Sequence, residues 1–107
     1  MSDETSLPST GPGVPEGAIS KELLIVNKRG LHARASAKFV QAVERFNAQV
    51  WVTRGGETVG GTSIMGLMML AAGPGTVITV AAAGDDAEAA LAAITELVES
   101  KFNEEGT

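Results

Sequence analysis

The single histidine of the chain, His32, lies in the segment Gly30-Leu31-His32-Ala33-Arg34. Gly30 permits backbone angles that other residues avoid, and helical spacing begins after it, so His32 falls at or next to a helix N-terminus. The first N–H groups of a helix lack intrahelical partners and, with the helix dipole, attract anions. Arg34 adds a permanently charged, bidentate donor. A neutral imidazole beside such an anion site is a nucleophile suited to accept a phosphoryl group.

These residues also allow simpler interpretations. A lone histidine near a helix start is more often a surface residue or a weak cap than a nucleophile. An enzyme active site is disfavoured, because one histidine, no cysteine and no clustered carboxylates provide neither an acid–base pair nor a metal site. The neighbouring Asp85, Asp86 and Glu88 are better explained by attraction to a helix dipole. We therefore expect no metal and no cofactor.

Composition narrows the classes of function further. A net charge of −5, with no run of Lys and Arg, argues against binding of nucleic acid. No segment approaches the ~18 uninterrupted apolar residues of a membrane span, so no membrane insertion is expected. The N-terminus also lacks the basic and apolar regions of a secretory signal. Without cysteine there can be no disulfide or thiolate metal site, and a cytoplasmic location is the default expectation.

The 107 residues are enough for one domain with a modest core. Residues 1–20 hold three of the four prolines and show no apolar periodicity, which is typical of a disordered tail. We expect the folded domain to span residues 21–102 and the C-terminus, residues 103–107, to be flexible.

Periodicity within that domain predicts strand, helix, strand, strand, helix, strand and helix. The strands are expected at 23–26, 48–53, about 58–59 and 76–82, with a hairpin turn at 54–57. The second helix is expected at 64–72, and a capping box of Asp85 and Glu88 would open the third. The first and third helices have one apolar stripe each: Ala35, Phe39, Ala42, Val43 and Phe46, then Ala87, Leu91, Ile94, Val98 and Phe102. A small sheet covered by helices, an α+β fold, follows.

The second predicted helix is apolar on more than one side. If Leu67 and Leu70 are buried, then Ile64, Met65 and Met68 occupy a different face. These three side chains either fill gaps in a generously packed core or form an exposed docking patch for a partner. Ser63, directly before this helix, is a favoured N-cap worth ~1 kcal/mol.

Taken together, these segments resemble the HPr family, the histidine phosphocarrier proteins of the bacterial phosphotransferase system. Residues 30–34 are similar to the active-site signature of the family, and Ser63-Ile64-Met65-Gly66-Leu67-Met68 to its second signature, around a regulatory serine. The resemblance covers Lys21 to about Lys101. It implies an open-faced β-sandwich in which three helices cover a four-stranded antiparallel sheet of order 1-4-2-3.

The resemblance also implies how the protein would act. His32 would be phosphorylated on Nδ1 by enzyme I, itself charged from phosphoenolpyruvate, and would pass the group to a histidine of an enzyme IIA protein. The Arg34 side chain and the backbone N–H groups of Ala33 and Arg34 would hold the phosphate. The protein would be a monomeric phosphoryl-transfer intermediate and not a free-standing enzyme.

Two further implications concern the second helix. Ser63 would match the regulatory serine that HPr kinase/phosphorylase modifies in many members. Because the family docks partners through its first two helices, the docking interpretation of Ile64, Met65 and Met68 is favoured.

Several residues depart from the usual pattern of the family. Ala35 stands where proline is usual, and Thr62 where many members have a lysine before the serine. Gln41, Glu44 and Gly66 replace lysines of some sugar-transport members, which hints at the nitrogen-related branch. An alternative function is therefore a regulatory binding module whose phosphorylation state controls partner proteins without net delivery of phosphate.

Overall fold

The structure is a computed structural model that describes residues 14–104, so the predicted disorder of residues 1–13 and flexibility of residues 105–107 lie outside the described part of the chain. The observed element order matches the predicted one. The elements are β1 (Ile19–Leu24), α1 (Ala33–Glu44), β2 (Gln49–Arg54), β3 (Glu57–Gly60), α2 (Ile64–Met69), β4 (Val77–Ala83), α3 (Ala87–Glu99) and the short 3-10 helix η1 (Lys101–Asn103).

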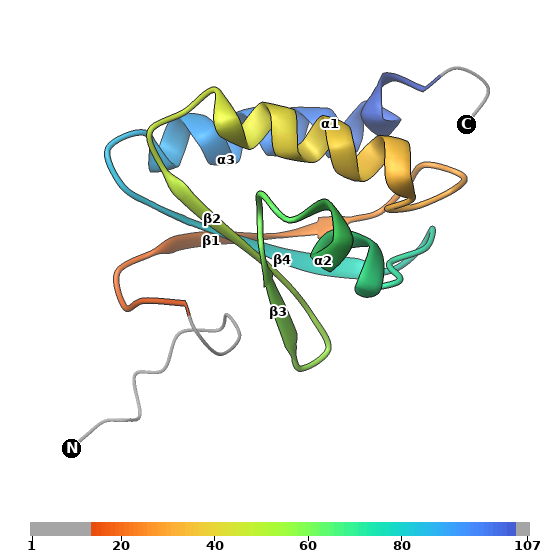
Figure 1. Cartoon of the computed structure of the whole chain (residues 1–107), viewed down its shortest axis with the longest axis horizontal. Helices are drawn as coiled ribbons and strands as arrows, with labels where there is room; N and C mark the ends of the chain where they lie inside the picture. The colour runs from red at the N-terminus through yellow and green to blue at the C-terminus, as the bar shows by residue number, and fades with distance from the viewer. Residues whose placement is uncertain (1–13, 105–107) are drawn as a thin grey trace.

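The four strands form one sheet in the order β1-β4-β2-β3, and every neighbouring pair is antiparallel. The strand order is therefore the one that the resemblance implied, and the α+β class is as the sequence predicted. Helices α1 and α3 run side by side above the sheet, and the short α2 lies against β3 and next to α1 (Figure 1). The loop that precedes α1 lies at one end of the molecule, together with η1, which follows α3 (Figure 1).

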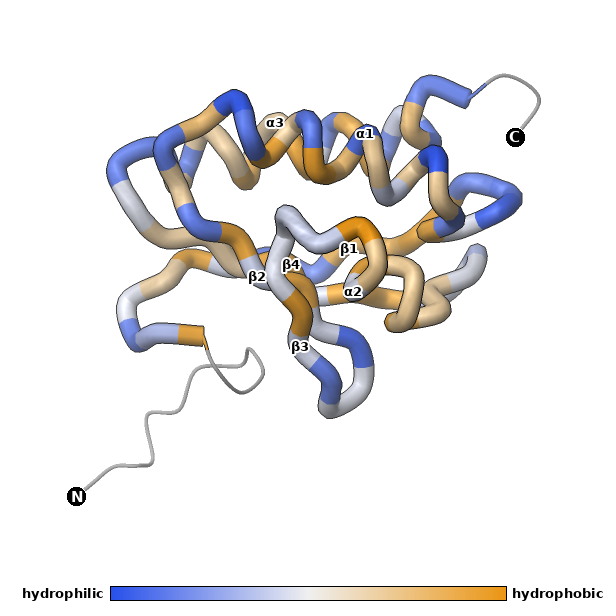
Figure 2. Tube along the Cα trace, viewed as in Figure 1, coloured by the Kyte–Doolittle hydropathy of each residue, from blue (hydrophilic) through white to orange (hydrophobic). Residues whose placement is uncertain are grey.

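The core lies between the helices and the sheet. Phe39 of α1, Val80 of β4 and Ile94 of α3 are fully buried, so both long helices and the sheet contribute side chains to this core. On β2 the predicted alternation is confirmed, because Val50 and Val52 face the core. Hydrophobic positions recur along the strands and helices, whereas the loop before α1 and the tip of the β2–β3 hairpin are hydrophilic (Figure 2).

The first strand begins earlier than expected. β1 starts at Ile19, which pairs with Ala82 of β4, so the domain boundary lies before residue 21 and Ser20 is no part of a tail. β1 is an edge strand that pairs only with β4 among the described strands, so backbone hydrogen bonds hold it on one side. Its exposed residues Ser20 and Glu22 are polar, so the sequence shows no hydrophobic pattern at the start of this strand.

Two helix boundaries also differ. α2 ends at Met69, and Ala71 beyond it has a left-handed φ of 53°, so the predicted end at residue 72 was wrong. The N-cap of α3 is Asp86, whose side chain makes no cap hydrogen bond, so the predicted capping box of Asp85 and Glu88 was also wrong. The carboxylates of Asp85 and Asp86 instead accept hydrogen bonds from Asn47 in the loop before β2.

The apolar stripes are largely as predicted, with local exceptions. Phe46 lies beyond the end of α1 and is only partly buried. In α3 the fully buried positions are Ala90, Ile94 and Val98. Leu91, which was predicted to belong to this stripe, faces the edge of the sheet and is partly exposed. Phe102 is fully buried, but in η1 and not in a continuation of the helix.

Candidate functional site

The loop that places His32 depends on Gly30. Its φ is +65°, and a Cβ at this position would lie 2.2 Å from the backbone oxygen of Ala72. The next residue, Leu31, donates its N–H to that oxygen at 2.9 Å, and its side chain is buried. Glycine is required here because both the backbone angle and the close approach exclude a side chain. The loop is thereby held firmly against the segment that follows α2.

His32 is the N-cap of α1, as the sequence predicted. Its backbone is extended, and its carbonyl accepts the first helical hydrogen bond from Ser36 N at 2.8 Å. The Nδ1 atom of its ring accepts a hydrogen bond from the backbone N–H of Arg34 at 3.3 Å. Nδ1 therefore carries a lone pair and faces the first turn of the helix, formed by Ala33 and its successors, where N–H groups lack intrahelical partners.

The other ring nitrogen of His32 contacts a carboxylate that sequence reasoning missed. Nε2 lies 2.6 Å from Oε2 of Glu104, and Asn27 Nδ2 donates to Oε1 of the same carboxylate at 3.3 Å. Because Nδ1 acts as the acceptor, Nε2 carries the proton and donates it to Glu104. The Glu104 side chain is only 7% exposed, against 22% for His32.

Glu104 reaches the ring through an unusual turn after α3. Lys101, Phe102 and Asn103 all have left-handed φ values, of 60°, 56° and 55°. The buried Phe102 side chain anchors the turn, and Lys38 of α1 donates to the Phe102 carbonyl at 2.6 Å. The sequence placed Glu104 in a flexible C-terminus, because no local pattern reports a contact between residues 72 positions apart.

The environment of Glu104 keeps it ionised. Burial by itself raises the pKa of the carboxyl, but the hydrogen bonds from His32 and Asn27, with the positive charge of Lys38, outweigh that effect. The net result is a pKa below the ordinary value of 4.5. At neutral pH the site therefore contains a carboxylate that faces the protonated nitrogen of His32.

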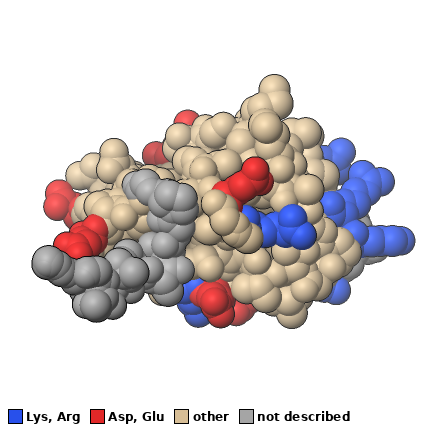
Figure 3. Space-filling view, turned by 90° about the horizontal axis from the view of Figure 1, so that it is seen from below, with Lys and Arg blue, Asp and Glu red and all other residues tan. Residues whose placement is uncertain are grey.

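Basic side chains surround this end of the molecule although the chain as a whole is acidic. Lys28 and Arg29 in the loop, and Arg34 in the first turn of α1, are all exposed. Most of the Lys and Arg side chains visible in Figure 3 gather at the end where this loop lies, whereas the Asp and Glu side chains are scattered over the rest of that face. An incoming anion would meet a locally positive surface at His32.

Ser63 is the N-cap of α2, as predicted. Its hydroxyl accepts a hydrogen bond from Gly66 N at 2.9 Å, and the residue itself is exposed. The hydroxyl oxygen is thus at the surface and at the positive end of a short helix.

The faces of α2 divide as predicted. Leu67 and Leu70 are buried, whereas Ile64, Met65 and Met68 are 41%, 69% and 40% exposed. Met69, which the sequence analysis did not single out, is 72% exposed. We call these four exposed residues the α2 patch. The core-filling interpretation of Met65 was therefore wrong, and an apolar surface lies beside the helix whose N-terminus carries His32.

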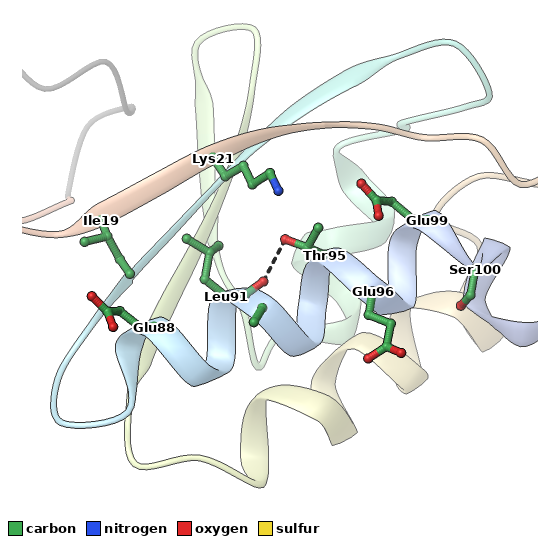
Figure 4. Close-up of a pocket in the computed structure, with 9 residues that line it drawn as sticks. Ile19, Lys21, Glu88, Leu91, Thr95, Glu96, Glu99 and Ser100 are labelled. Atoms are coloured by element: carbon green, nitrogen blue, oxygen red, sulfur yellow. Dashed lines mark hydrogen bonds between the residues drawn. The ribbon is translucent and has the colours of Figure 1, made fainter.

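A groove between β1 and α3 lies apart from this site (Figure 4). Leu91 and Thr95 of α3 form its floor opposite Ile19 and Lys21, and Thr95 Oγ1 donates to the Leu91 carbonyl at 2.8 Å. Among residues 14–104, no group of His, Asp or Glu side chains is placed to hold a metal ion. Within the same part of the chain, no helix combines the length and hydrophobicity needed to cross a bilayer.

The sheet, its helices and the histidine together define a small α+β domain that presents one imidazole, with Nδ1 accepting a hydrogen bond, at a helix N-terminus. A family model described as "PTS HPr component phosphorylation site" matches residues 19–100. The chain is 49% identical to "Phosphocarrier protein HPr" of Neisseria meningitidis over 86 residues, which covers 80% of this chain and 97% of that protein. It is 41% identical to "Phosphocarrier protein NPr" of Shewanella violacea, with 80% and 94% of the two chains covered.

The solved structures agree with the sequence comparison. A crystal structure of HPr from Thermoanaerobacter tengcongensis superposes with a TM-score of 0.78 at 45% identity, covering 81% of this chain and 98% of the other. The chain belongs to the HPr family of the phosphotransferase system. Members of this family are phosphocarrier proteins, which are phosphoryl-transfer intermediates and not enzymes, and they generally interact with enzyme I and enzyme IIA proteins.

Proposed function

We propose that Nδ1 of His32 accepts a phosphoryl group from phosphoenolpyruvate-charged enzyme I and passes it to a histidine of an enzyme IIA protein. The observation that carries the proposal is the pair of ring contacts. Arg34 N–H donates to Nδ1, and Nε2 faces the Glu104 carboxylate, so the nucleophilic lone pair lies on the nitrogen at the helix N-terminus.

The residues around Nδ1 suit the charge of the transferred group. The lone pair of Nδ1 attacks phosphorus, the bond to the donor nitrogen breaks, and its electron pair returns to the donor ring. The phosphate oxygens then lie near the backbone N–H groups of Ala33 and Arg34, and the exposed Arg34 guanidinium can reach them. Delivery to the acceptor is the same step in reverse, so catalysis consists of positioning and stabilisation of charge.

The α2 patch is proposed to dock both partners, with Ile64, Met65 and Met68 as its central contacts. Their exposure and their place beside α1 support this assignment. A monomer presents this surface to one partner at a time. The transfer is proposed to take place in the cytoplasm, where phosphoenolpyruvate is produced.

Ser63 is proposed as a regulatory phosphorylation site for HPr kinase/phosphorylase. Its hydroxyl is exposed and caps α2, where a phosphate is electrostatically tolerated. About two negative charges would then lie beside the α2 patch and repel an acidic partner. The expected consequence is slower phosphorylation of His32.

The central proposal is tested with enzyme I and radiolabelled phosphoenolpyruvate. The wild-type chain is expected to acquire an acid-labile label, and His32→Ala is expected to acquire none. Ser63→Ala serves as a control variant, because it removes the other candidate phosphorylation site, a hydroxyl, and is expected to retain the label. Equal labelling of the wild type and His32→Ala would refute the assignment.

The alternative is a regulatory binding module, and two observations favour it. Gln41, Glu44 and Gly66 leave the docking surface less basic than in sugar-transport members, and the NPr protein of Shewanella violacea is among the relatives. A chase experiment separates the two functions. Label that moves from His32 to an added enzyme IIA protein supports the carrier, whereas label that stays on His32 supports the regulator.

A further inference from the structure

We infer that the groove between β1 and α3, which we call the β1–α3 groove, binds an extended segment of a partner protein. The segment adds as a further strand beside β1 and carries one aliphatic side chain between two basic ones. This inference goes beyond the proposed function, because it assigns a second interaction surface that is separate from His32 and from the α2 patch. It rests on the edge of β1, the lining of the groove and the charges at its two ends.

The edge of β1 is available for strand pairing. Among the described strands, β1 (Ile19–Leu24) pairs only with β4, so the backbone groups on its other side point away from the sheet. α3 packs against β1, and the groove follows the helix alongside the strand (Figure 4). An extended segment beside β1 would therefore bond to the strand through its backbone, and every second side chain would enter the groove. This is the geometry of β-augmentation.

The middle of the groove is apolar. Leu91 of α3 is only partly buried in the core and lies opposite Ile19 of β1 (Figure 4). The hydroxyl of Thr95 donates to the Leu91 carbonyl at 2.8 Å, so its proton is used within the helix. Lys21 projects from β1 over the groove, and the methylene groups of such a side chain pack readily against apolar neighbours (Figure 4). An aliphatic side chain of the partner therefore suits this central part.

The two ends of the groove carry acidic side chains. Glu88 lies beside Ile19 at one end, Glu99 lies at the other end, and both glutamates are exposed (Figure 4). At a rise of about 1.5 Å per residue, the two positions in α3 are about 16 Å apart. An extended strand covers this distance in about five residues, and side chains two positions apart point to the same face. Basic side chains four positions apart, with the aliphatic one midway, would therefore reach both glutamates.

The charge of the groove favours a basic partner over this chain itself. Its lining residues include three glutamates and one lysine. Residues 1–13 contain two acidic residues and no Lys or Arg, and the whole chain has a net charge of −5. Neither the N-terminal segment of the chain nor a second copy therefore complements the groove as well as a basic segment does. The lining belongs to β1, α3 and the C-cap of α3, so a bound partner leaves His32 accessible.

The first test titrates the full-length chain with a synthetic peptide of seven residues. Threonine occupies the outward positions, and lysine, leucine and lysine occupy the inward ones. At millimolar concentration we expect the peptide to shift the backbone amide signals of β1 and of residues 88–99. It should also slow hydrogen exchange at the β1 amides that do not bond to β4, while the amide signals of α2 stay unchanged. Unshifted β1 signals, or shifts centred on α2, would overturn the inference.

Control peptides separate strand addition from general attraction between charges. One exchanges the leucine with a lysine, which keeps the composition and the net charge, and it should bind about 10-fold more weakly. Two others carry methyl groups on alternate backbone nitrogens, one for each alternate set. Only the set that faces β1 should weaken binding, by about 10-fold, because only those nitrogens donate to the strand. Equal affinity of the exchanged peptide, or of both methylated peptides, for the chain would contradict an added strand.

Matched variants locate the site on the protein. Glu88→Lys with Glu99→Lys reverses the charge at both ends of the groove. Glu44→Lys with Glu57→Lys makes the same change in net charge at exposed positions of α1 and β3. We expect only the first pair to weaken binding of the basic peptide, by about 10-fold or more. Equal losses in the two pairs would show that the peptide responds to net charge alone, and the inference would fail.

Two further outcomes would give the groove another occupant and overturn the inference. In the full chain without peptide, a nuclear Overhauser contact between the methyl groups of Leu91 and Leu7 would assign the groove to the chain's own N-terminal segment. Signals of β1 that shift on dilution would assign it to a second copy.

The last measurement tests the separation of the two surfaces. With saturating peptide, labelling of His32 by enzyme I should proceed at an unchanged rate, and inhibition would refute independent surfaces. Because peptide binding is measured without enzyme I, a failure of the proposed function would be distinguished from a failure of this inference.

Discussion

Replacement of Gly30 by alanine tests how strictly the loop places His32, and Gly55 in the β2–β3 turn supplies a matched control. Both glycines have left-handed φ values, +65° and +61°, so alanine at either position costs about 1–2 kcal/mol of backbone energy. At Gly55 a new Cβ meets nothing within 4 Å. At Gly30 it would lie 2.2 Å from the oxygen of Ala72 and 2.8 Å from Cα of Gly73, and both are backbone atoms.

The Gly30 variant must therefore move the backbone. The oxygen of Ala72 is the acceptor for Leu31 N–H at 2.9 Å, and losing this bond at a buried donor costs about 1–3 kcal/mol more. We expect Gly30→Ala to lose about 2–5 kcal/mol of unfolding free energy and Gly55→Ala about 1–2 kcal/mol. Urea titration measures both losses, and an unchanged m-value identifies a change in stability alone.

The same displacement is expected to affect transfer. A shift of about 1 Å in a reacting group can cost about 100-fold in rate, so phosphorylation of folded Gly30→Ala by enzyme I should be slowed far more than that of Gly55→Ala. The rates are compared without urea, at a temperature at which both variants are folded. Equal losses of stability in the two variants, or equal phosphorylation rates, would show that the close approach at Ala72 does not position His32.

Met65→Asp should leave the thermal midpoint nearly unchanged, because the side chain is 69% exposed, and should slow transfer from enzyme I by about 5- to 30-fold; a large loss of stability would contradict the exposed patch. Ser63→Ala should lose about 1 kcal/mol in urea titration through the missing bond to Gly66 N. Ser63→Asp keeps a capping oxygen, so it should retain stability while it slows phosphorylation of His32. An unchanged rate of transfer would mean that Ser63 acts only as a helix cap. Because the pKa of Glu104 is lowered on folding, its contribution to stability is complete above pH 4.5 and is lost as pH falls through the folded value. The stability gap between wild type and Glu104→Gln should therefore narrow from pH 7 to pH 3, and a gap that widens would refute the direction of the shift.

Much of the fold could be predicted because its signals are local. The stripe around Phe39 in α1, the alternation of Val50 and Val52 in β2, and the glycines of the hairpin turn each follow from neighbours within a few residues. The caps Ser63 and His32 were predictable for the same reason, since a cap bonds to N–H groups two or three residues ahead. The predictions failed where a contact with a distant segment determines the local structure. Asp85 and Asp86 bond to Asn47 across the molecule instead of capping their own helix as predicted.

The sequence by itself determined the element order, the apolar face of each long helix, and the presence of one histidine at a helix start. It also supplied the family resemblance, because Gly30-Leu31-His32-Ala33-Arg34 and the segment around Ser63 are local motifs. The family resemblance already implied Nδ1 as the phosphorylated nitrogen, and only the tertiary structure showed which group faces the other ring nitrogen of His32. That group is Glu104, whose carboxylate reaches Nε2 because Phe102 is anchored in the core and Lys38 donates to the Phe102 carbonyl in the left-handed turn after α3. A contact made through the packing of separate helices leaves no periodic signal in the chain, so the carboxylate at Nε2 is visible only in three dimensions.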